Sequence, residues 1–133
     1  MDMHETERLV LRRPRLRDAG EFLAFLGDPE AMRYTQCLSS LRECRRHIAA
    51  HERQRSRVGC APWTVLTKAD RQIVGRGGLY ADPFDSGWGI ELGYHFAPGA
   101  WGRGYASELA RLALDMAWNA LGLGEVLAFA HPG

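Results

Sequence analysis

The sequence predicts a mixed α/β fold in which an antiparallel meander of strands is followed by a β-α-β unit with a parallel crossover. Three observations support this prediction: an early segment alternates charged and aliphatic residues, two later segments flank a polar stretch as in a hairpin, and the longest helical pattern lies between two strand patterns. The chain has 133 residues, of which 46% are hydrophobic. Residues 1–133 are therefore expected to form a single domain with one core.

The first strand and the first helix are predicted near the N-terminus. Charged and aliphatic side chains alternate from Arg8 to Arg13, which is the period-two pattern of a strand with one buried face, and Pro14 ends the pattern. Asp18 and Glu21 have the spacing of a capping box. This box predicts the start of a short helix that Gly27 ends.

A second, longer helix is predicted to begin after Ser40, which forms a capping box with Glu43, and to end near Arg55. Its polar face allows two interpretations, a solvated face with glutamate partners or a basic surface that docks on RNA or a ribosome. The first is favoured, because no aromatic residues are interleaved to stack on bases and no nucleic-acid motif is present. The arginines of this face are Arg42, Arg45, Arg46, Arg53 and Arg55.

Three strands are predicted in the middle of the chain. Residues 63–67 and 72–75 flank a polar stretch and indicate a hairpin, whose second arm continues to Tyr80. The pair Gly77-Gly78 within this arm suggests a bulge or a close backbone approach. A turn cluster follows, and residues 88–96 form the next strand, which completes the meander.

The last helix and the last strand form the predicted crossover. The pattern from about Gly102 to Leu121 is that of a helix with a wide apolar stripe, buried against a sheet, and Gly122 ends it. Residues Glu125–Ala130 are apolar and predict a strand parallel to the strand before the helix, reached by a right-handed crossover.

The loop before this helix is the candidate binding site. Gly102 and Gly104 have no Cβ, so their backbone can approach a ligand closely, and a helix N-terminus presents free N–H groups to a phosphate. A helix start that binds nothing is one alternative. A dinucleotide fingerprint is another, because Gly102, Gly104 and Ser107 nearly match G-x-G-x-x-G. It fails on context, since few residues remain for further parallel strands.

A third interpretation comes from a family resemblance. The motif Trp101-Gly102-Arg103-Gly104-Tyr105-Ala106, with Glu91-Leu92-Gly93-Tyr94-His95-Phe96 before it and Glu108 after it, resembles the acetyl-CoA signature of GNAT N-acetyltransferases, particularly the RimJ/RimL-type branch. Within the general pattern Q/R-x-x-G-x-G/A, Trp101 stands at the Q/R place, a departure typical of that branch. Residues 6–12 and 15–19 also resemble the start of that branch, so the resemblance covers nearly the whole chain.

This resemblance implies a GNAT fold and an acetyl-CoA-dependent N-acetyltransferase. The acetyl group would pass directly to a primary amine, on a protein N-terminus or a small molecule, with no metal implied. A non-catalytic acyl-CoA-binding module of the same fold is the alternative. By the resemblance, Phe96 and Ala97 hold the pantetheine arm, and the pyrophosphate is held by Trp101, Gly102, Arg103, Gly104, Tyr105, Ala106 and Ser107.

The candidate catalytic base is Glu91. Period two places Glu91, Gly93 and His95 on one face of the strand beside the expected thioester, and a carboxylate there can take the amine proton directly or through water. A structural glutamate paired with arginine is the alternative. His95 is the second candidate, with an ordinary sheet histidine as its alternative.

Composition gives the expected setting. The net charge of +1 argues neither for nor against a nucleic-acid partner. The N-terminus is acidic and polar, and no stretch holds the ~18 consecutive apolar residues of a membrane span, so a cytoplasmic protein is expected. Cys37, Cys44 and Cys60 follow no metal or disulfide spacing and are predicted to be free thiols.

The resemblance also predicts that the chain is incomplete at its C-terminal end. Family members continue past the last strand with another helix and a closing strand pair. Without those elements the strand Glu125–Ala130 would be an edge with unpaired backbone groups. We therefore expect self-association into a homo-oligomer through that edge.

Overall fold

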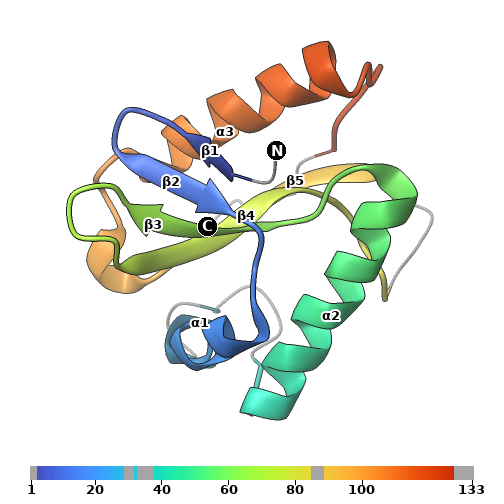
Figure 1. The fold of residues 1–133 in the computed structure, drawn as a ribbon. Coiled ribbons are helices and arrows are strands. Elements are labelled where there is room, and N and C mark those ends of the chain that lie inside the picture. The colour runs from blue at the N-terminus through green and yellow to red at the C-terminus, as the bar shows by residue number, and fades with distance from the viewer. Residues whose placement is uncertain (1–2, 29–31, 33–37, 85–88, 128–133) are drawn as a thin grey trace.

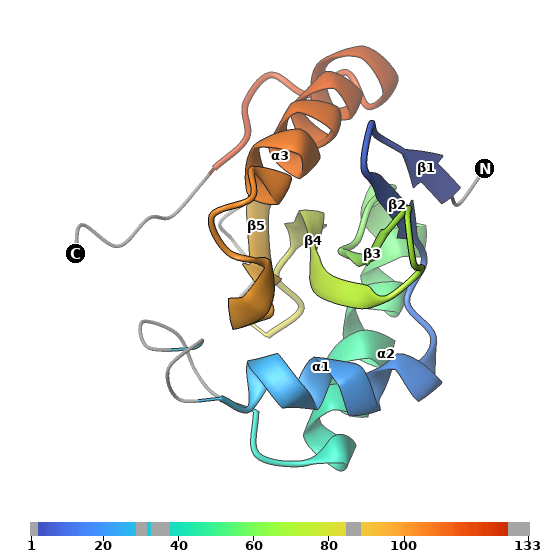
Figure 2. The same ribbon diagram turned by 90° about the vertical axis from the view of Figure 1, so that its left-hand side faces the viewer.

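The computed structural model describes residues 3–28, 32, 38–84 and 89–127, which form three layers (Figures 1 and 2). An antiparallel sheet in the order β1-β2-β3-β4-β5 is in the middle, with α3 on one face and α1 and α2 on the other. The strands are β1 (Met3–Glu5), β2 (Leu9–Arg12), β3 (Trp63–Thr67), β4 (Ile73–Ala81) and β5 (Ile90–Phe96). The helices are α1 (Ala19–Leu26), α2 (Leu41–Val58) and α3 (Tyr105–Asp115), with 3-10 turns at Leu16–Asp18 and Pro98–Ala100 and a π-helical turn at Met116–Ala120.

The predicted mixed α/β fold and its antiparallel meander are confirmed. The parallel return after α3 is confirmed at one residue, Leu127, which forms a parallel bridge with Glu91 of β5. The N–H of Leu127 donates to the carbonyl of Ile90 at 3.0 Å, and its carbonyl accepts the N–H of Leu92 at 2.7 Å. The rest of the predicted strand, residues 128–130, lies outside the described residues, so self-association through this edge stays a prediction.

Strand β1 was not predicted. It pairs antiparallel with β2, and its sequence is polar because it is an edge strand with two of its three residues exposed. Only His4 is partly buried, and its ring contacts the Trp63 ring at a centroid distance of 5.4 Å. An edge strand of this kind lacks the apolar alternation from which a strand is predicted.

The predicted capping box of Asp18 and Glu21 is wrong, although Gly27 does end α1. The Asp18 side chain makes no cap to α1 and instead accepts the N–H of Arg15 at 2.9 Å, one turn earlier. The second box is confirmed, since Ser40 Oγ accepts the N–H of Glu43 at 3.1 Å. Helix α2 continues past the predicted end near Arg55 to Val58.

The predicted close approach at Gly77-Gly78 is confirmed, and the bulge lies elsewhere. A Cβ on Gly77 would overlap the side chain of Tyr94 on β5, and one on Gly78, at φ +139°, would lie 2.8 Å from the Trp63 ring. The register shift falls between Val65 and Leu66 of β3, where Val74 of β4 is the extra residue. The two glycines therefore allow close packing against Tyr94 and Trp63. The bulge lies at Val74, a residue with a side chain.

Two apolar clusters fill the spaces on either side of the sheet. The cluster beneath α3 contains Leu9, Leu11, Cys60, Trp63, Val65, Leu79, Phe96, Ala100, Leu109, Ala113 and Ala117. The cluster around α1 and α2 contains Ala19, Phe22, Phe25, Leu26, Met32, Leu38, Cys44 and Ile48. Alternate residues of β2 and β3, namely Leu9, Leu11, Trp63 and Val65, belong to the cluster beneath α3, as the period of two requires.

Cys44 and Cys60 are buried free thiols, as predicted, and Cys37 lies outside the described residues. None of the helices in the described ranges combines the length and the apolar composition needed to cross a membrane.

A buried ion pair joins β2, β3 and the start of α1. The carboxylate of Asp18, whose residue is 2% exposed, accepts both Arg12 nitrogens at 2.8 and 2.9 Å and the Thr64 hydroxyl at 2.8 Å. Burial alone would raise the pKa of this carboxyl, but the bonds from Arg12, the Arg15 N–H and Thr64 together hold it below the ordinary 3.8. Asp18 thus contributes stability above that pH, and this contribution is lost as pH falls through the lower folded-state pKa.

We expect Asp18→Asn to lower the free energy of unfolding by about 3 kcal/mol and the Tm by about 10 °C, because the partly buried Arg12 guanidinium loses its counter-charge. Urea unfolding at pH 7 measures the difference. The deficit should shrink as pH falls below the ordinary aspartate pKa of 3.8, where the unfolded wild-type chain binds the proton first, and through the lower folded-state pKa of Asp18.

Glu5→Gln is the matched control, because Glu5 pairs with Lys68 at 3.7 Å and both side chains are substantially exposed. This acid-to-amide change should cost less than about 0.5 kcal/mol. Equal effects of the two substitutions would show that Asp18 is not a structural centre of the fold.

Candidate functional site

The loop before α3 has the backbone expected of an anion site. Gly102 and Gly104 have φ values of +75° and +81°, so α3 begins at Tyr105 rather than at Gly102 as predicted. The N–H of Glu108 makes the first turn's bond to the carbonyl of Gly104 at 3.2 Å. Gly104 has no side chain to cap the helix, so the N–H groups of residues 105–107 have no acceptor within the helix. These groups, with the helix dipole, favour a bound phosphate.

A cavity of about 320 Å³ lies between this loop and the end of β5. Seven of the nine residues predicted to bind acetyl-CoA line it: Phe96, Trp101, Gly102, Gly104, Tyr105, Ala106 and Ser107. The other two, Ala97 and Arg103, are adjacent in sequence but not part of its wall. Arg103 is exposed, and its Nε donates to the Gly99 carbonyl at 3.2 Å.

An arginine that sequence analysis missed lies beside the loop. The guanidinium of Arg8 would be 3.2 Å from a Cβ at position 104, and it lies over the Tyr105 ring at 4.7 Å. Glu108 holds it there, since Arg8 Nε donates to Glu108 Oε2 at 2.6 Å and the Thr6 hydroxyl donates to Oε1 at 2.7 Å. These partners are about 100 residues apart in the sequence, so no local pattern could pair them.

The outer edge of β5 can bind an extended arm. Residues of one parity along β5 direct their backbone groups away from β4, as Leu92 does toward Leu127. Tyr94 and Phe96 share this parity and lie beyond the Leu127 bridge. The Phe96 carbonyl accepts Trp101 Nε1 at 2.8 Å, and the Ala97 N–H donates to the Val74 carbonyl on β4 at 2.8 Å.

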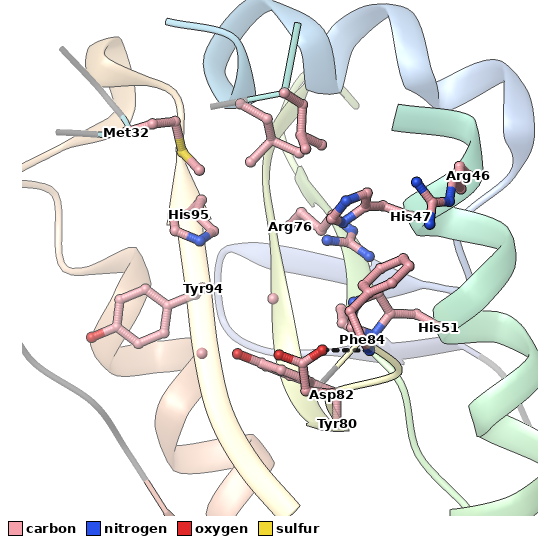
Figure 3. Close-up of a pocket in the computed structure, with 15 residues that line it drawn as sticks. Met32, Arg46, His47, His51, Arg76, Tyr80, Asp82, Phe84, Tyr94 and His95 are labelled. Carbon is pink, nitrogen blue, oxygen red and sulfur yellow. Dashed lines mark hydrogen bonds between the residues drawn. The ribbon is translucent and has the colours of Figure 1, made fainter. Parts of the chain in front are cut away.

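A second cavity, of about 430 Å³, lies on the other side of β5, between β4–β5 and α2 (Figure 3). Tyr94 and His95 line both cavities, so β5 is the wall that they share. The register pairs Arg76 with His95 and Tyr80 with Glu91. These four side chains lie on one face of the sheet, with only glycines, Gly78 and Gly93, between the two pairs.

The second cavity contains a buried charge, Arg76, which is 8% exposed. Burial lowers its pKa to about 10, so the guanidinium is still charged at pH 7. Burial and this charge lower the pKa values of His47, His95 and His51, the last to about 3. The three histidines are therefore neutral at pH 7. Sequence analysis did not identify Arg76 as a candidate site residue. The available signal was that it is the one charged residue of β4 and stands between glycines.

The predicted base Glu91 is 7% exposed and does not line either cavity. Its charge acts on Tyr80, whose pKa is raised to about 12, first by burial and then by Glu91. Tyr80 lines the second cavity, and its hydroxyl lies over Gly93, where a Cβ would be 2.8 Å away. At pH 7 this phenol is protonated and can donate a hydrogen bond into the cavity.

The dinucleotide-fingerprint alternative is not supported among the described residues. All neighbouring strands of the sheet are antiparallel, whereas the dinucleotide fingerprint belongs to a parallel sheet. In the same ranges, no three His, Cys, Asp or Glu side chains gather as a metal site would require.

Comparisons with known proteins agree with this geometry. Residues 8–133 match the acetyltransferase (GNAT) domain family. The uncharacterized protein YkkB of Bacillus subtilis (strain 168) is 31% identical over 129 residues, which make up 96% of this chain and 75% of YkkB. The uncharacterized N-acetyltransferase p20 of Bacillus licheniformis is 27% identical over 139 residues, covering 99% of this chain and 75% of p20.

Solved acetyltransferase structures share the fold. The crystal structure of the acetyltransferase from Agrobacterium tumefaciens str. C58 superposes with a TM-score of 0.81 at 22% identity, covering 99% of this chain and 75% of that chain. The family match spans nearly the whole chain and includes the loop, both cavities and the β5 wall. The chain therefore belongs to the GNAT acetyltransferase domain family, and it is an acetyltransferase that uses acetyl-CoA.

Proposed function

We propose that this chain transfers the acetyl group of acetyl-CoA directly to a primary amine in a ternary complex. The observation that carries this proposal is that Tyr94 and His95 line both cavities. A thioester at the end of the first cavity and an amine in the second would meet at these residues. The amine nitrogen would bond to the thioester carbonyl carbon, the C–S bond would break, and the thiolate would take up a proton.

The residues around the first cavity fit acetyl-CoA. The open N–H groups at the start of α3 suit the pyrophosphate, and Arg8 supplies a fixed cation beside them. Arg103 is proposed as a second cation because it is exposed next to the loop. The pantetheine arm would run along the edge of β5 at Tyr94 and Phe96, toward Ala97.

Two side chains of β5 are proposed to handle the amine proton. His95 is neutral at pH 7 and lines both cavities, so it can contact the amine directly. Glu91 is four residues from His95 along β5 and is the cross-strand partner of Tyr80, so it would act through that hydroxyl or a water molecule. Tyr80 stays protonated and is proposed to donate to the developing oxyanion or to the thiolate.

The proposed acceptor class rests on the resemblance to the RimJ/RimL-type branch. The residue that indicates this branch is Trp101, which stands at the Q/R place of the loop motif. That branch acetylates protein N-termini or small amines. A non-catalytic acyl-CoA-binding protein is the alternative function. Release of free CoA with a panel of amines separates the two, because a binding protein would be stabilised by acetyl-CoA without releasing CoA.

For the loop, we expect Gly104→Asp to weaken acetyl-CoA binding by about 100-fold or more, because a carboxylate would face the pyrophosphate and would also bind Arg8. Gly104→Asn is the matched control, since both residues tolerate the φ of +81° and differ in charge. Titration calorimetry measures both Kd values. Similar weakening by Asn and Asp would contradict a phosphate at this loop.

For the base, we expect His95→Gln to lower kcat by about 100-fold, and Glu91→Gln to lower it by less, with acetyl-CoA affinity unchanged in both. The acidic limb of the wild-type kcat/KM profile should fall below the ordinary histidine pKa of 6.5, because burial and Arg76 lower the pKa of His95. A larger loss in Glu91→Gln, with the acidic limb retained in His95→Gln, would assign the base to Glu91.

A further inference from the structure

Arg76 is a buried charge, and two of its nitrogens have no hydrogen-bond partner among the described residues. Its Nε and Nη2 are both buried, and within the described ranges neither donates to any acceptor. Its described contact is the Phe22 ring, whose centroid is 5.7 Å from the guanidinium carbon. Figure 3 shows Arg76 extending from β4 toward His47, inside the second cavity.

Other arginines of this chain show what Arg76 lacks. Arg8, Arg12 and Arg55 each direct two guanidinium nitrogens at a carboxylate, on Glu108, Asp18 and Glu52 respectively. Arg76 is more buried than these three, yet the described residues give it no such partner. A charge buried without compensation is strongly destabilising, and a bound anion would compensate it.

Besides Arg76, the described lining of the cavity contains one further cation and one anion, so its formal charge is positive. His47 and His51 lie beside it on α2, and both are neutral at pH 7 because burial and Arg76 lower their pKa values. Arg46 also lines the cavity but is exposed, with its guanidinium 5.2 Å from the centre of the Phe84 ring. Asp82 lines the cavity as well and accepts the Phe84 N–H at 2.8 Å.

We propose that Arg76 binds a carboxylate of the acceptor, which makes the acceptor an amine that carries a carboxylate a few bonds away, as an amino acid does. The inference rests on the proposed function, since it places the amine at His95. Arg76 and His95 are direct cross-strand partners, so their Cβ atoms are about 5 Å apart. One buried cation matches a singly charged carboxylate better than a doubly charged phosphate.

The carboxylate has two sources, the α-carboxylate of a free amino acid or the acidic side chain of a protein's first residue. The shared chemistry is an amine and a carboxylate within one residue. Aspartic acid α-amide separates the two sources, because its only carboxylate is on the side chain. Turnover of this amide at the rate of free amino acids would assign the side-chain source.

The test measures CoA release with the twenty L-amino acids, each beside its α-carboxamide, and with aspartic acid α-amide. In the wild type, kcat/KM for the preferred carboxylate-bearing amine should exceed that of its neutral counterpart by about tenfold or more. In Arg76→Met this ratio should fall to near one. Arg46→Met removes a charge from the same cavity and should keep the ratio, because the exposed Arg46 is well screened.

Stability provides a second measurement. Arg76→Met should leave the Tm unchanged or raise it, because an uncompensated buried charge is replaced by an apolar side chain of similar length. A fall of more than about 5 °C would make Arg76 structural and overturn the inference. Two further results would overturn the inference. One is that Arg46→Met lowers the kcat/KM ratio of carboxylate-bearing to neutral amines as much as Arg76→Met does, and the other is that the wild type prefers neutral amines.

Failure of the inference and failure of the proposed function give different results. CoA release with neutral amines alone would overturn the carboxylate inference and leave the transferase proposal standing. Acetyl-CoA binding without CoA release from any amine would overturn both and support the non-catalytic alternative. We expect release with the carboxylate-bearing amines and loss of that preference in Arg76→Met.

Discussion

The pairing of β4 with β5 holds the two cavities in a fixed relation, and the rest of the site depends on it. Its register places Arg76 opposite His95 and Tyr80 opposite Glu91, so the charged and polar groups occur in two matched pairs. Gly77 allows this register, because a side chain there would overlap Tyr94. In the proposed function the same strand β5 would serve both substrates, with its backbone edge toward acetyl-CoA and the side chains of Arg76's partner His95 and of Tyr94 toward the acceptor.

The sequence predicted those parts of the molecule that depend on local patterns. The hairpin from Trp63, the capping box of Ser40 and the glycine loop before α3 each depend on residues close together in the chain, and the structure has all of them. The partners of Asp18 could not be predicted, because Thr64 is 46 residues away. Its carboxylate was assigned to a cap of α1, whereas it forms a buried ion pair with Arg12 and accepts the distant Thr64 hydroxyl.

In the candidate site, too, the parts that depend on neighbouring residues were predicted and those that depend on distant residues were not. The loop was found through its glycines and a family motif, but Arg8 is positioned by Glu108, which is 100 residues away. Glu91 and His95 were placed on one face by the strand period, which is correct, but the period does not show which of them reaches a cavity. That difference depends on Tyr80 leaning over Gly93, a contact between two strands.

The bonds from Thr6 and Arg8 to Glu108 connect the N-terminal segment to the first turn of α3, which is the proposed pyrophosphate site. Ligand binding at that turn and docking of the first ten residues are therefore thermodynamically linked, since each stabilises the conformation that the other requires. Amide protons of β1 and the β1–β2 turn would exchange more slowly with solvent when the loop is occupied. An affinity tag that pulls on this segment would, by the same linkage, weaken cofactor binding from outside the cavity.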